Sequence, residues 1–164
     1  MSNREIFENH ALNLGKLVGN LLTIEMAARL AIVKLDSHAA SQVFTQLPQV
    51  KEGDQIEWNA FTNSDDLRQT LEKYNKRAPS TCKIDVSSIV NLRDALAHGR
   101  TFGSGEMTHL RLLKFNRKKQ QGNILVTFAQ DMTGEWFRKN IEMLNFAIAK
   151  VATAIDYEMR EFLD

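Results

Sequence analysis

The sequence has little of what marks secreted, membrane-spanning or disordered proteins. Its 164 residues include one cysteine, Cys82, so no disulfide can form within the chain and a reducing compartment is expected. The first ten residues carry scattered charges and no signal-peptide-like apolar run, and no stretch approaches the roughly 18 apolar residues of a membrane span. These absences predict a cytoplasmic protein with no membrane partner.

Neither sign of charge dominates, and proline is scarce. The chain has 21 basic and 20 acidic side chains, two prolines, 43% hydrophobic residues and 25% charged residues. These proportions are typical of globular proteins and argue against disorder. Together with the length, they predict a single domain over residues 1–164.

Apolar residues at helical spacing predict a mainly α fold: a bundle of two long helices and two or more short ones. The expected helices cover residues 3–35, 39–46, 65–77, 86–98 and 134–162. Ser64, Asp85 and Thr133 are the expected N-caps of the last three. Gly99 is expected to end the fourth helix in a left-handed conformation.

The apolar positions also predict which helix faces are buried. The first helix is expected to bury Ile6, Leu14, Val18, Leu21, Leu22, Met26, Leu30 and Val33, and the last helix Trp136, Phe137, Ile141, Leu144, Ile148, Val151 and Ile155. Gly15 and Gly19 each cost the first helix about 1 kcal/mol relative to alanine. Either close packing against another helix offsets this cost, or the helix tolerates it without compensation. Trp58 and Phe61 are expected to pin a loop over residues 47–63 to the core.

Strand-like alternation appears only in residues 108–130. The segments THLRLLKFN and NILVTFAQ flank a polar tip from Lys118 to Gly122, a pattern typical of a β-hairpin. The expected fold is therefore a helical bundle decorated by a hairpin.

The helix over residues 86–98 carries the candidate chemistry. Asp94 and His98 are four residues apart and share a helix face, so Asp94 can orient or pair with His98. Carbonyl groups of the last helical turn and the aspartate both favour protonated His98, placing proton exchange near neutral pH. Arg93 offers a planar guanidinium that suits a phosphate. A helix-terminating histidine with a salt-bridge partner is the competing, purely structural interpretation.

The segment Arg93-Asp94-Ala95-Leu96-Ala97-His98 resembles the Arg-polar-x3-His motif of the HEPN superfamily. The resemblance implies a helical fold that dimerises and joins two motifs in one cleft, where many members cut RNA without metal. His98 would be the acid-base group, Arg93 the phosphate and transition-state ligand, and Asp94 the polar residue that supports the histidine. It further implies a toxin or phage-defence role, with an antitoxin or regulatory protein as partner. The alternative is a non-catalytic dimerisation or nucleotide-binding interaction module.

Residues 100–120 form a basic segment directly after the motif. Six cationic side chains stand there against Glu106 alone: Arg100, Arg111, Lys114, Arg117, Lys118 and Lys119. Such a patch would attract RNA phosphates in a salt-dependent way, although lysines at a hairpin tip also serve simply to keep it solvated.

No metal or organic cofactor is expected. Cys82, His98 and His109 do not have the spacing of a zinc site, and no glycine-rich phosphate loop is present. His10 and His38 are expected to be surface or capping residues, although His10 could reach the motif from the first helix.

Overall fold

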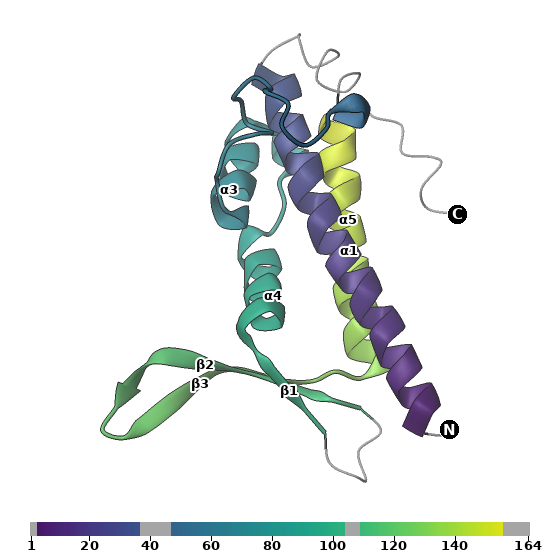
Figure 1. Cartoon of the computed structure of the whole chain (residues 1–164), viewed down its shortest axis with the longest axis vertical. Helices are drawn as coiled ribbons and strands as arrows, with labels where there is room; N and C mark the ends of the chain where they lie inside the picture. The colour runs from purple at the N-terminus through teal and green to yellow at the C-terminus, as the bar shows by residue number, and fades with distance from the viewer. Residues whose placement is uncertain (1–2, 37–46, 104–108, 156–164) are drawn as a thin grey trace. The chain divides into compact units, whose positions relative to one another are not determined.

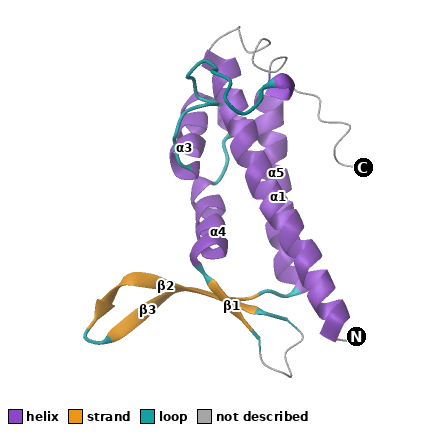
Figure 2. Ribbon diagram, viewed as in Figure 1, coloured by secondary structure: helices purple, strands orange, loops and turns teal. Residues whose placement is uncertain are grey.

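The computed structural model describes residues 3–36, 47–103 and 109–155 (Figure 1). The described part is mainly helical with one small antiparallel sheet, which confirms the predicted fold class (Figure 2). The helices are α1 (Asn3–Asp36), α3 (Leu67–Arg77), α4 (Val86–His98) and α5 (Gly134–Ala154), with short 3-10 turns η1 (Leu47–Gln49) and η2 (Ser80–Cys82). The predicted helix over 39–46, the predicted helical segment 156–162 and His38 lie outside the described residues.

The chain divides into two compact units. Unit 1 comprises Met1–Leu21 and Ser87–Leu144, and unit 2 comprises Leu22–Val86 and Asn145–Asp164. The candidate motif and the sheet both belong to unit 1.

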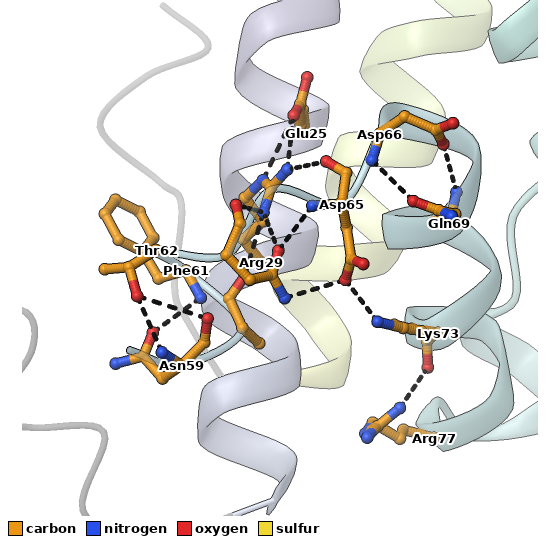
Figure 3. A network of polar contacts seen from close by, with 12 residues as sticks. Glu25, Arg29, Asn59, Phe61, Thr62, Asp65, Asp66, Gln69, Lys73 and Arg77 are labelled. Carbon is orange, nitrogen blue, oxygen red and sulfur yellow. Dashed lines mark hydrogen bonds and ion pairs between the residues drawn. The ribbon is translucent and has the colours of Figure 1, made fainter. Parts of the chain in front are cut away.

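In unit 2, a largely buried arginine of α1 holds a loop through several hydrogen bonds. The Arg29 side chain, 11% exposed, pairs with Glu25 at 3.0 Å and donates to the backbone carbonyls of Ala60, Asn63 and Asp65 (Figure 3). A planar guanidinium with five donors can satisfy several carbonyls at once. Arg29 therefore fixes the loop that leads into α3.

A capping box starts α3. Asp66 accepts a hydrogen bond from the Gln69 backbone at 2.8 Å, and the Gln69 side chain accepts one from the Asp66 backbone at 3.0 Å. The predicted cap, Ser64, is therefore wrong by two residues, because the reciprocal box is available only to Asp66. Asp65 is engaged by Lys73 at 2.5 Å, which is the main cause of the lowered pKa of that carboxyl group.

Buried polar contacts hold the segment between α3 and α4. The Tyr74 hydroxyl donates to the Cys82 carbonyl at 3.0 Å, and burial raises the pKa of Tyr74 to about 12. The Asn75 amide donates to the Ile84 carbonyl at 2.9 Å and accepts from the Ile84 backbone at 3.0 Å. These contacts hold the chain just before α4, which begins at Val86 as predicted.

Unit 1 contains a three-stranded antiparallel sheet in the order β1-β2-β3. The strands β2 (Arg111–Gln120) and β3 (Asn123–Asp131) confirm the predicted hairpin, and β1 (Arg100–Phe102) adds a third strand that was not predicted. Gln121 and Gly122 form the hairpin turn with φ of 49° and 83°. Positive φ at both central residues matches the right-handed twist of a two-residue hairpin.

The helix α5 agrees with its prediction more closely than α1 does. The Thr133 hydroxyl accepts from the Trp136 backbone at 3.1 Å, as expected of the N-cap, and Phe137, Leu144, Ile148 and Val151 are buried. In α1, Leu21 and Val33 are buried as predicted, but Val18, Leu22 and Met26 are 42, 65 and 50% exposed, while Leu17, Ile24, Ala28 and Ala31 form the core face. Apolar residues surround much of this helix, so periodicity alone selected a partly wrong face.

Two further packing predictions fail. At Gly15 and Gly19 an added Cβ would meet no heavy atom within 4 Å in the described part of the chain, so no close helix packing offsets their cost. Trp58 is 79% exposed and does not pin the loop, whereas Phe61 is half-buried. The Arg29 contacts hold that loop instead.

Candidate functional site

The C-terminal half of α4 presents the motif outward because its apolar residues face the core. Ile89, Leu92 and Ala95 are buried, whereas Arg93 and His98 are exposed and Asp94 is half-buried. The helix ends at His98, as predicted, and β1 begins two residues later. The motif therefore lies at the junction between helix and sheet.

Asp94 is bound by two cations. Its carboxylate lies 3.1 Å from Arg93 Nη1 and 3.8 Å from Lys114 Nζ of β2. Within the described chain no hydrogen bond or ion pair joins Asp94 to His98, so the expected pairing is not found. The carboxylate is paired instead with Arg93 of the same helix and with Lys114, which the sheet brings to it.

His98 is exposed at the end of α4. Over the ranges that the structure describes, its imidazole makes no hydrogen bond, ion pair or ring contact. Among the described residues, neither ring nitrogen of His98 therefore has a partner.

Gly99 joins the motif helix to β1 through a close approach. Its backbone N–H donates to the Ala95 carbonyl at 2.8 Å, and a Cβ here would lie 2.2 Å from that oxygen and 2.6 Å from Leu112 Cδ1. Its φ is outside the left-handed region, so the predicted left-handed stop is wrong. Glycine is required instead because the chain passes directly from the end of α4 into β1, which packs against β2 with Arg100 paired to Leu113.

The six basic residues predicted to bind RNA fall into two groups. Arg111 pairs with Asp131 at 3.2 Å and Lys114 with Asp94, whereas Arg100 lies over the Phe115 ring with its Cζ 5.7 Å from the centroid. At the hairpin tip, Arg117, Lys118 and Lys119 are exposed, and no described carboxylate pairs with them. Sequence alone could not make this division, because the acidic partners come from α4 and from the far end of β3.

His10, His109 and Cys82 each contact or are buried by neighbouring protein side chains. His10 packs edge-on against Phe137 at 5.3 Å between ring centroids, and burial lowers the pKa of its imidazole. His109 lies 3.9 Å from Asp131, and Cys82 is buried. In residues 3–36, 47–103 and 109–155, no three His, Cys, Asp or Glu side chains are grouped closely enough to hold a metal ion.

Comparison with known proteins adds no assignment: no family model, curated protein or solved structure matches this chain. None of the described helices has both the length and the apolar character needed to span a membrane. The case for function rests on the motif and its surroundings.

Proposed function

We propose that this chain is a HEPN-like, metal-independent endoribonuclease whose site is formed by Arg93, Asp94 and His98. One observation carries the proposal: an exposed histidine, which has no partner among the described residues, stands at the end of the same helix as an exposed arginine. That helix continues directly into a sheet that carries five further cations on β2, with Arg100 on β1. Imidazole and guanidinium are the groups that phosphodiester cleavage needs.

The reaction is an internal transesterification. A histidine base removes the proton of the RNA 2′-hydroxyl, the oxygen attacks the adjacent phosphorus, and a histidine acid protonates the leaving 5′-oxygen. The guanidinium of Arg93 stabilises charge developing on the phosphoryl oxygens. The products are a 2′,3′-cyclic phosphate and a 5′-hydroxyl. The two proton transfers require two groups, so a homodimer that contributes one His98 from each copy fits the chemistry.

Asp94 acts in this proposal through the cations. By pairing with Arg93 and Lys114 it holds both side chains beside the end of α4, where a phosphate would be bound. This role replaces direct support of His98. Asp94 is therefore a positioning residue.

The wider setting follows from the motif resemblance. It comprises a single HEPN-like domain, a toxin or phage-defence role, and an antitoxin or regulatory protein as partner. These further proposals depend on the ribonuclease activity.

A specific contact favours a second function, that of a non-catalytic interaction module. The carboxylate of Asp94 already neutralises part of the Arg93 charge at 3.1 Å, as in an ordinary surface ion pair. On this account α4 would serve dimerisation or nucleotide binding.

Incubation of the purified protein with labelled tRNA and ribosomal RNA in EDTA separates the two functions. His98→Ala and Arg93→Ala are compared with His109→Gln, which changes a histidine of the same unit outside the motif. Cleavage that leaves cyclic phosphates and is lost only in the two motif variants supports the enzyme. Equal traces for all four proteins would leave the interaction module.

Mixing wild type with excess His98→Ala tests the shared site. If one cleft needs His98 from both copies, the mixed dimer is inactive and cleavage falls as the square of the wild-type fraction, whereas independent sites would lose activity only in proportion to that fraction. Light scattering gives the oligomeric state, and a monomer that cleaves RNA would exclude the two-histidine arrangement.

A further inference from the structure

Some cationic side chains of the hairpin are paired with carboxylates within the described chain, and others are not. Arg111 and Lys114, at the end of β2 nearer the motif, pair with Asp131 and Asp94 at 3.2 and 3.8 Å. In the described part of the chain, no carboxylate pairs with Arg117, Lys118 or Lys119, and all three are exposed. The uncompensated charge of β2 is therefore concentrated at the hairpin tip, defined here as residues 117–123.

The strand is irregular where these cations stand. Phe115 pairs with Val126 and Lys119 with Ile124, so three residues of β2 oppose one residue of β3. The side chain of Asn116 turns back to accept a hydrogen bond from the Arg117 backbone at 2.7 Å. Successive side chains of a regular strand point to opposite faces, and a bulge breaks that alternation. The tip can thus direct neighbouring cations to one ligand.

The tip is separated from the motif along a defined path. Leu113 pairs with Arg100, which follows His98 by two residues. Because Phe115 and Lys119 pair with residues of β3 that are only two apart, the strand from Leu113 to Lys119 advances by about four regular steps, or roughly 13 Å at about 3.3 Å per residue. A ligand held by both places must be extended.

The composition of the tip favours nucleic-acid phosphates over a protein partner. Residues 117–123 contain three cations, three amide side chains and one glycine, and no aliphatic or aromatic residue. Lysine, arginine, asparagine and glutamine are the side chains that contact phosphate and sugar, whereas protein interfaces depend on buried aromatic and apolar anchors. Exposed, unpaired cations also lose no internal ion pair when they bind.

We propose that the hairpin tip is an anchor for the RNA phosphate backbone, distinct from the motif, and that it supplies most of the binding affinity. The inference rests on the proposed function only in taking RNA as the ligand. The motif then contacts the scissile phosphate, while the tip holds the strand at a distance.

The salt dependence of binding tests this anchor. Fluorescence anisotropy with a labelled single-stranded RNA and its duplex, in EDTA, is measured in a His98→Ala background so that cleavage cannot deplete the probe. The tip variant Arg117→Gln/Lys118→Gln/Lys119→Gln is compared with Lys16→Gln/Lys76→Gln/Lys139→Gln, which removes the same charge from exposed sites elsewhere. Each single-strand phosphate contact adds about 0.7 to the slope of log affinity against log salt.

The expected result is a slope smaller by about 2 for the tip variant, so that its affinity deficit shrinks roughly 20-fold between about 50 and 200 mM salt. The control triple variant should stay near the wild-type slope, and charge-preserving Arg117→Lys should retain it. Equal slopes for the tip and control triples would overturn the anchor. So would the absence of RNA binding at low salt, which would point to an acidic protein partner. Salt-dependent binding through the tip, together with no RNA cleavage by the wild-type protein, would sustain the anchor and remove the proposed enzyme.

Discussion

Replacing Gly99 with alanine should destabilise the fold, whereas the same replacement at another glycine should stabilise it. The added methyl group would lie 2.2 Å from the Ala95 carbonyl oxygen and 2.6 Å from Leu112 Cδ1. The first neighbour is backbone and cannot rotate away, so the helix end and β1 must shift. Overpacking of this kind costs about 1 to 3 kcal/mol of unfolding free energy.

Gly15→Ala is the matched control. A Cβ there meets nothing within 4 Å of the described chain, and the residue lies inside α1. Alanine should stabilise the helix by about 1 kcal/mol, because glycine loses more backbone entropy on folding. The two variants should therefore differ by about 2 to 4 kcal/mol with opposite signs relative to wild type.

Urea unfolding followed by circular dichroism measures this difference through the transition midpoints. The shift at Gly99 also moves the motif, so Gly99→Ala should lose RNA cleavage under conditions where most of the protein remains folded. Equal midpoints for the Gly99 and Gly15 variants would refute the close approach at the helix-sheet junction.

Three further predictions follow from individual contacts. Arg29→Met should lower the unfolding free energy by about 3 kcal/mol in a urea titration, because three backbone carbonyls lose a charged donor. Arg68→Met removes an exposed ion pair and should cost under about 1 kcal/mol, so equal losses would contradict a stabilising role for the Arg29 contacts. Burial lowers the pKa of His10, so the unfolded chain binds the imidazole proton more tightly, and the stability of the fold should fall as the pH drops from about 6.5 toward the lower folded pKa. In His10→Gln the melting temperature should depend less on pH across that window, and an unchanged pH dependence would contradict the prediction. Asp94→Asn should tighten RNA binding at low salt by freeing two cations while slowing single-turnover cleavage, and weaker binding would exclude the positioning role.

Local patterns in the sequence predicted most elements because their signals are local. The helix over 86–98 follows from apolar spacing, and the hairpin from alternation around a polar tip, and both lie where expected. The N-cap Thr133 needs only a hydroxyl before a helical run. The cap of α3 moved from Ser64 to Asp66 because three adjacent residues can each cap, and the choice depends on which finds a reciprocal partner in Gln69.

The candidate site was predictable as a set of residues but not as a set of contacts. Arg93, Asp94 and His98 were found from their spacing, and the side chains do lie outward at one helix end. The partner of Asp94 was not predictable, since Lys114 is distant in sequence and reaches it only through β2. The third strand was also missed, because three residues carry too short an alternation to be read as a strand.

The sequence by itself determined the mainly helical class, the hairpin and the residues that could carry chemistry, since each depends on periodicity or side-chain type within a few neighbouring positions. Only the tertiary structure decided which face of α1 is buried, because apolar residues surround that helix and burial depends on what packs against it. It also decided which cations are free, since an ion pair forms between segments that folding brings together. That distinction separates Arg111 and Lys114, which are paired with carboxylates, from the cations at the hairpin tip, which have no described carboxylate partner.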